Sequence, residues 1–186
     1  MAASDPSDKL VSERRASDLL GIVHQISISK GGVPKLAVPE AWASPLGLEG
    51  DGHNQPQFHG GLSKALLLVS LEDLEALRAD GFPVFPGALG ENLTIRGIDF
   101  RKLRSGQRFV VGDAAIELTT LRQPCSVLNV YNPSAETMIQ KRLYDARAKA
   151  GDPSSPVWAM GGFYASIVQR GLINTGVTIA LADHVV

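Results

Sequence analysis

Short runs of alternating apolar and polar residues recur along the chain and predict a protein built mainly from β-strands. The stretch "GIVHQISIS" at 21–29 puts Ile22, His24, Ile26 and Ile28 on one side, as expected for a half-buried strand. The run "KALLLVS" at 64–70 is a continuous apolar segment of strand length. Further strands are predicted at 35–38, 93–95, 107–111, 114–121, 162–169 and 176–183.

Two segments have helical patterns. A helix is predicted over 71–80: Ser70 and Asp73 have the spacing of a capping box at its start, and Gly81 ends it. Apolar positions recur at helical spacing across 135–151, which predicts a second helix. About seven or eight short strands and two helices favour the mainly β fold class, with one β-barrel and helices as plugs or flanks.

Composition and charge narrow the picture. The chain has 186 residues and a formal net charge of −1, so no global positive field draws it to nucleic acid or to an anionic membrane. No apolar run reaches the roughly 18 residues of a membrane span. We expect a flexible tail at 1–20 without a secretory or mitochondrial address, one domain at 21–182 and a C-terminal tail at 183–186. A single cysteine suits a reducing compartment such as the cytoplasm.

That cysteine, Cys125, lies in "TTLRQPCSVLN", just after a predicted strand. Two interpretations stay open from the residues alone. A lone cysteine in such a chain is often a small buried apolar residue. A thiol in a turn at a strand end can instead be exposed, and Arg122 three residues earlier would favour its thiolate form.

Other candidate residues lie in glycine-dense turns at 49–61, 86–92 and 160–164, where backbone can approach a ligand closely. Lys64 enters an apolar strand beside such a turn and is a plausible charge for a phosphate, or an ordinary surface lysine. The pair Glu91 and Asn92 offers an acceptor and an amide to a heterocycle, or simply caps a turn.

The histidines are candidates for metal ligands and for catalytic bases. His53, His59 and Asp51 share one loop, but their spacing matches no standard zinc motif, so we favour solvated or hydrogen-bonding histidines. His24 is expected to be a satisfied histidine on the core face of its strand. A hydrolase that uses Cys125 with His59 lacks an obvious orienting partner.

Five motifs occur in one order: "LEGDGH", "HGGLSKALLLVS", "PGALGENLTI", "LRSGQRFVVGDAAIELTTLRQPC" and "GGFYASIVQRGLINTGVTIAL". Together they resemble the MOSC family, named after the C-terminal domain of molybdenum cofactor sulfurase. The resemblance implies a β-barrel with peripheral helices and a bound molybdenum cofactor, with Cys125 as the ligand of the metal. It also implies a set of residues around the pterin and its phosphate: His59, Gly60, Gly61, Lys64, Glu91, Asn92 and Arg122.

The resemblance leaves two functional hypotheses. The first is a reductase of N-hydroxylated small molecules. Its electrons would come from a separate flavin or iron–sulfur protein, because we expect a stand-alone domain with no ferredoxin domain. The second is a carrier that hands the cofactor, or sulfur as a persulfide of Cys125, to a partner enzyme. We expect no pyridoxal phosphate, because no aminotransferase-like segment is recognised.

Overall fold

The computed structural model describes residues 19–52 and 60–182, which form two sheets and several short helices. The strands are β1 (Leu20–Ile28), β2 (Leu36–Val38), β3 (Glu40–Ser44), β4 (Gly47–Leu48), β5 (Leu66–Ser70), β6 (Leu93–Arg96), β7 (Arg108–Val111), β8 (Ala114–Leu121), β9 (Phe163–Gln169), β10 (Gly171–Asn174) and β11 (Thr178–Leu181). The α-helices are α2 (Leu71–Ala79), α3 (Ile139–Leu143) and α4 (Ala146–Lys149), and the 3-10 helices are η1 (Leu62–Lys64), η2 (Phe100–Lys102) and η3 (Ser126–Tyr131).

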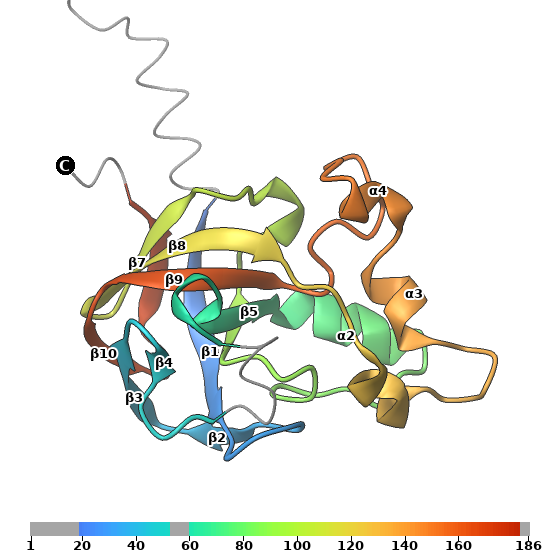
Figure 1. Ribbon diagram of the computed structural model, residues 1–186, viewed down its shortest axis with the longest axis horizontal. Coiled ribbons are helices and arrows are strands. Elements are labelled where there is room, and N and C mark those ends of the chain that lie inside the picture. Colours follow the sequence, from blue (N-terminus) through green and yellow to red (C-terminus); the bar gives the residue numbers. More distant parts are fainter. Residues whose placement is uncertain (1–18, 53–59, 183–186) are drawn as a thin grey trace, which may run out of the picture.

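Seven strands of the described residues close into a barrel (Figure 1). The larger sheet runs in the order β11-β7-β8-β9-β5-β6-β1-β2, and β1 also pairs with β11, which joins its two sides. Strands β5 and β6 pair in parallel because α2 connects them as a crossover. The prediction of a mainly β barrel is confirmed.

The apolar run of β5 is explained by burial on both faces. Leu66 and Leu68 point into the barrel core, whereas Leu67 and Val69 belong to a second apolar cluster. That second cluster contains Leu74 of α2 and side chains of the η3 and α3 region. A strand covered on both faces reads as continuous apolar sequence rather than as alternation.

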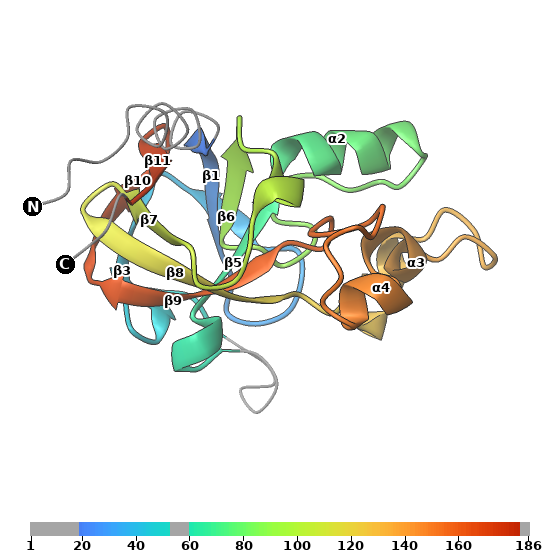
Figure 2. The same cartoon turned by 90° about the horizontal axis from the view of Figure 1, so that it is seen from above.

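The α-helices gather beside one side of the barrel in both cartoon views (Figure 2). Helix α2 confirms its prediction: the Ser70 hydroxyl accepts a hydrogen bond from the Asp73 N–H at 3.2 Å. The prediction of one helix over 135–151 is wrong. Tyr144 is extended, and the Asp145 carboxylate accepts the Ala148 N–H at 2.7 Å, which starts α4 as a separate helix. No helix of the described ranges is long and apolar enough to span a bilayer.

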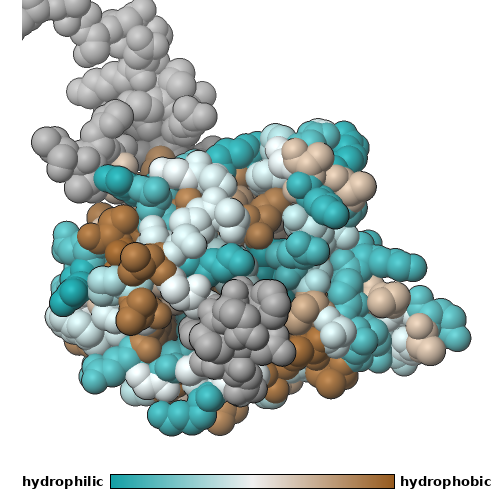
Figure 3. Space-filling model, in the orientation of Figure 1, coloured by the Kyte–Doolittle hydropathy of each residue, from teal (hydrophilic) through white to brown (hydrophobic). Residues whose placement is uncertain are grey.

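A small second sheet was not predicted. Its order is β10-β3-β4, with Gly171–Asn174 paired to Glu40–Ala43. These residues lie between prolines or in a presumed connection, and only long-range pairing makes them strands. Ala41 and Ala43 face inward, whereas Trp42 is 47% exposed. Figure 3 shows apolar side chains in patches on this side of the molecule, where β3, β9 and β10 lie.

Strand β1 corrects the prediction for His24. A bulge between Val23 and Gln25 changes which side chains face the core. Val23 is buried, whereas His24 is exposed and is not a core histidine. Leu19 is also buried. Of the predicted tails, all of 183–186 and all of 1–20 except Leu19 and Leu20 lie outside the described residues.

Candidate functional site

Loops from one end of several strands surround a cavity of about 180 Å³. Cys125 and three cationic residues, Lys35, Lys64 and Arg122, all line it. Its other described lining residues are Gly32, Val33, Gly52, Gly60, Leu67, Leu89, Gly90, Asn92, Val127 and Tyr164. A thiol and three cations in one cavity favour a ligand that carries negative charge and a soft metal or an electrophile.

Cys125 is half-buried and has no disulfide partner. It follows β8 and stands immediately before η3. Its carbonyl oxygen accepts hydrogen bonds from the Leu128 N–H at 3.2 Å and from Gln140 Nε2 at 3.1 Å. These bonds fix the backbone of the turn that brings Cys125 to the cavity wall. The interpretation of Cys125 as an inert core residue is therefore disfavoured.

Arg122 is a buried cation, 4% exposed, whose backbone N–H donates to the Gly162 carbonyl at 2.9 Å. Its Nη2 donates to the Leu89 carbonyl at 3.1 Å. Its Nη1 is buried and finds no acceptor among the described residues. Burial lowers the pKa of Arg122, and Tyr164, Cys125 and Glu91 oppose that shift. A buried guanidinium nitrogen at a cavity wall is suited to an anionic oxygen of a ligand.

Lys64 and Tyr164 stand together beside Arg122. The Lys64 ammonium lies 5.3 Å from the centre of the Tyr164 ring, a cation–π distance. Burial raises the pKa of Tyr164, and the Arg122 guanidinium acts in the opposite direction. Lys64 follows Gly60 and Gly61 at the end of η1, so the glycine turn places its charge at the cavity.

Of the two described glycines in the predicted "HGG" turn, one lines the cavity and the other does not. Gly60 lines the cavity, whereas Gly61 is exposed and begins η1. His59 and His53 lie outside the described residues. Within the described ranges, no group of three or more metal-ligating side chains comes together. Asp51, the third residue of the metal site considered from the sequence, instead forms an ion pair with Lys35.

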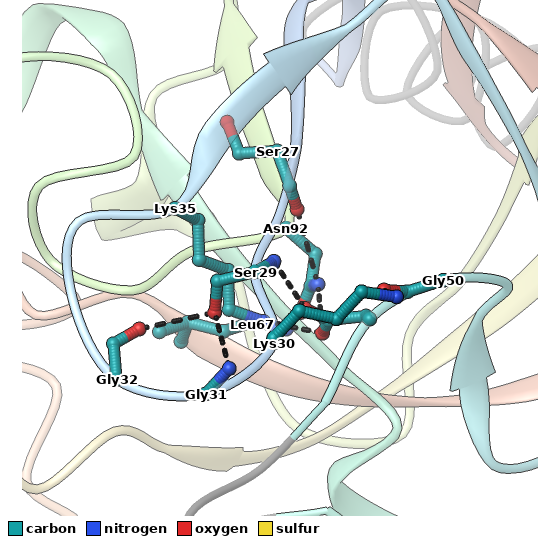
Figure 4. Close-up of polar contacts among 10 residues, drawn as sticks. Ser27, Ser29, Lys30, Gly31, Gly32, Lys35, Gly50, Leu67 and Asn92 are labelled. Carbon is teal, nitrogen blue, oxygen red and sulfur yellow. Dashed lines mark hydrogen bonds and ion pairs between the residues drawn. The ribbon is translucent and has the colours of Figure 1, made fainter.

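Asn92 lines the cavity, but the fold already uses its amide (Figure 4). Its Oδ1 accepts the Leu67 N–H at 3.2 Å. Its Nδ2 donates to the Ser27 carbonyl at 3.3 Å and to Asp51 Oδ2 at 2.8 Å. Both amide hydrogens therefore have partners, and the prediction that Asn92 offers a donor to a heterocycle is not supported by this geometry.

Glu91 is fully buried and is not a lining residue of the cavity. Its carboxylate accepts the N–H groups of Gly87 at 2.6 Å and Leu89 at 3.0 Å, and the Thr94 hydroxyl at 3.2 Å. Burial raises the pKa of Glu91, and these hydrogen bonds counteract the shift. We correct its predicted role from ligand contact to bracing of the 86–90 loop, whose Leu89 carbonyl receives Arg122.

Comparison with known proteins settles the family. The sequence model of a protein family, the MOSC domain, matches residues 55–180 of this chain. The chain belongs to the MOSC domain family. Among curated relatives of this MOSC chain, an uncharacterised protein YflK of Bacillus subtilis is 26% identical over 140 residues, covering 73% of this chain and 56% of YflK. Protein YiiM of Escherichia coli is 35% identical over 98 residues, covering 50% of this chain and 43% of YiiM. The chain thus spans about half the length of the curated relatives it matches.

Two solved structures share the fold of this chain. The YUAD protein of Bacillus subtilis superposes with a TM-score of 0.64 at 19% identity, covering 88% of this chain and 96% of that chain. YiiM of Geobacillus stearothermophilus gives a TM-score of 0.62 at 23% identity, covering 88% of this chain and 75% of that chain. At these identities the likeness supports the architecture alone.

The MOSC family is associated with molybdenum cofactor binding, so the cavity can be tested for that ligand. The orphaned Arg122 Nη1 and the Lys64 ammonium suit an anionic phosphate. The Cys125 sulfur suits a soft metal. The chemistry of these three side chains therefore fits the phosphate and the metal of the group.

Proposed function

We propose that this MOSC chain binds the molybdenum cofactor in the described cavity, with Cys125 as the protein ligand of the metal. The single observation that carries the proposal is the buried Nη1 of Arg122, which lacks an acceptor among the described residues, in a side chain whose residue lines the same cavity as Cys125. A buried donor without a partner costs about 1–3 kcal/mol. An anionic ligand that accepts a hydrogen bond from this nitrogen removes that cost, and its binding therefore stabilises the folded protein.

Different residues of the chain hold different parts of the cofactor. Arg122 and Lys64 bind its anionic phosphate, the first rigidly from the buried wall and the second from the end of η1. Cys125 donates its thiolate sulfur to the metal. Leu67 and Leu89 provide apolar wall, which limits water around the charged contacts and strengthens them. When bound, the cofactor supplies two-electron redox chemistry at the metal.

We propose further that the bound protein reduces N-hydroxylated small molecules to the corresponding amines. The half-buried position of Cys125 supports this, because the residue lines the cavity and is partly accessible to a small molecule. The electrons come from a separate flavin or iron–sulfur protein. The cavity of about 180 Å³ is small, so the substrate would approach through its mouth rather than be fully enclosed with the cofactor.

The test begins with protein purified from cells that make the cofactor. Molybdenum and pterin are quantified in the wild type and in Cys125→Ala, and reduction of a hydroxylamine-type substrate is measured with a competent electron donor. We expect cofactor and turnover in the wild type, and loss of turnover with retained pterin in Cys125→Ala. A wild type without molybdenum and pterin would overturn the binding proposal. Cofactor without turnover would overturn the reductase proposal and favour the carrier.

A further inference from the structure

A buried lysine lines the same cavity and is given no role by the proposed function. Lys35 lies in the loop before β2, is 6% exposed and lines the cavity together with Cys125. Its Nζ forms an ion pair with Asp51, whose side chain is 3% exposed. Asp51 is the one hydrogen-bond acceptor found for this ammonium among the described residues. An ammonium has three N–H donors, so Lys35 retains donors for a ligand in the cavity.

Asp51 is itself held firmly, which fixes the position of Lys35. The Asp51 carboxylate accepts the Ser29 N–H at 2.9 Å and Asn92 Nδ2 at 2.8 Å as well as the Lys35 ammonium. Figure 4 shows these groups converging from the β1–β2 loop and from the start of β6. Asn92 is anchored in turn to β5 through Leu67. The network therefore positions the lysine rather than merely neutralising it.

The surroundings of Lys35 suit a group that gives and regains a proton. Burial lowers the pKa of Lys35, while the charges of Asp51 and Glu91 oppose the shift. Arg122 shares the cavity, but a guanidinium does not release its proton at neutral pH. Lys64, the third cation of the cavity, is less buried than Lys35 and stacks over Tyr164. Among these cations, Lys35 has the environment typical of a general acid.

We propose that the Lys35 ammonium, held by Asp51, donates a proton to the hydroxyl oxygen of the N-hydroxylated substrate. This inference rests on the proposed reductase function. The N–O bond breaks, and the hydroxyl group takes the lysine proton and leaves as water. The reduction takes two electrons in total, which the separate flavin or iron–sulfur protein supplies, and this pair remains on nitrogen. That nitrogen takes a second proton from solvent, and solvent also reprotonates Lys35.

The kinetic test compares Lys35→Met and Lys35→Arg with Lys30→Met, because Lys30 is an exposed lysine of the same loop. We expect both Lys35 variants to retain cofactor and to lose about 10²-fold or more in kcat, since general acids contribute roughly 10²–10⁴-fold. Lys35→Arg keeps the positive charge and should still be slow. Lys30→Met should match the wild type. A wild-type rate in Lys35→Arg would overturn the proposal.

A second readout does not depend on turnover. The side-chain pKa of Lys35 is measured by NMR titration of cofactor-free protein with isotope-labelled lysine, and Lys35→Met assigns its signal. We expect the pKa of Lys35 to lie below the ordinary value of a lysine, and to fall further in Asp51→Asn, because Asp51 raises it. When kcat is plotted against pH, its decrease at high pH should then begin at a lower pH in Asp51→Asn, because Lys35 loses its proton earlier.

The possible failures are distinguishable. If the pKa of Lys35 shifts in Asp51→Asn while the decrease of kcat at high pH stays in place, Lys35 is not the proton donor. If the pKa of Lys35 equals the ordinary value of a lysine and does not change in Asp51→Asn, the proposed network does not control the ammonium and the inference fails. If cofactor-loaded wild type shows no turnover at any pH, the reductase function fails first, and proton donation fails with it.

Discussion

Replacing Glu91 by Gln separates a bracing role from a ligand-binding role. The Glu91 carboxylate accepts two backbone N–H groups, at 2.6 and 3.0 Å, and one hydroxyl at 3.2 Å. Glutamine keeps one acceptor oxygen, and its amide nitrogen then faces a donor N–H. Two effects oppose each other. The neutral amide relieves the cost of burying a charge, while one buried N–H loses its partner.

We expect the lost partner to outweigh the relief, because hydrogen bonds to charged groups contribute about 1.5–3 kcal/mol and an unsatisfied buried donor costs about 1–3 kcal/mol more. The relief offsets part of this sum, so the expected net loss is about 2 kcal/mol. For a chain of this length, that corresponds to roughly 4–8 °C in Tm. Cofactor retention should weaken as well, because the braced loop carries the Leu89 carbonyl that holds Arg122.

The assay is urea denaturation of cofactor-free protein, followed by fluorescence of the buried Trp158. The matched control is Glu49→Gln, which changes an exposed glutamate and should leave the free energy of unfolding unchanged. If Glu91→Gln loses cofactor while the cofactor-free protein keeps its full stability, the bracing argument is refuted. Glu91 would then contact the ligand directly, as the sequence suggested.

Three further predictions address charge, pH and close packing. Lys64→Glu should lower cofactor retention by repelling its phosphate with little change in unfolding free energy; unchanged retention would make Lys64 an ordinary surface lysine. Burial raises the pKa of Asp73 from 3.8 to about 6, only partly opposed by Arg101, so the folded state binds this proton more tightly than the unfolded state. Stability from this group therefore falls as pH rises from 3.8 to 6, and Asp73→Asn should gain up to about 3 kcal/mol relative to wild type between pH 4 and 7. A pH-independent difference in urea titrations would contradict this. A Cβ at Gly162, where φ is 89°, would lie 2.2 Å from the Leu68 carbonyl, whereas one at Gly176 has the same φ and meets nothing within 4 Å. Gly162→Ala should therefore cost more than the about 1–3 kcal/mol of backbone strain expected for Gly176→Ala, and equal losses in Tm would rule out the clash.

Local patterns predicted the elements whose stability is decided locally. The α2 helix has its own cap at Ser70, and the β7–β8 hairpin turns at Gly112 and Asp113, as the sequence indicated. The small sheet escaped prediction because its pairing joins residues 40–43 to residues 171–174. The broken helix escaped because helical spacing hid a competing cap at Asp145.

The site residues likewise separate into those that the sequence predicted and those that only long-range contacts bring together. The resemblance named Lys64, Arg122 and Cys125, and the fold brings all three to one cavity. Lys35 was missed because its only local signal was a lysine in a proline-punctuated segment. Its partner Asp51 was noticed, but as part of a metal site. The two residues meet only because the β1–β2 loop folds against the end of the β4 loop, which no local pattern reports.

The central claim is that the Cys125 sulfur binds the metal of a molybdenum cofactor held in this cavity. X-ray absorption at the molybdenum edge measures the number of sulfur atoms bound to the metal in purified protein. The account predicts one more sulfur neighbour in the wild type than in Cys125→Ser, with pterin present in both. Equal sulfur coordination in the two proteins, or a wild type without molybdenum, would contradict it.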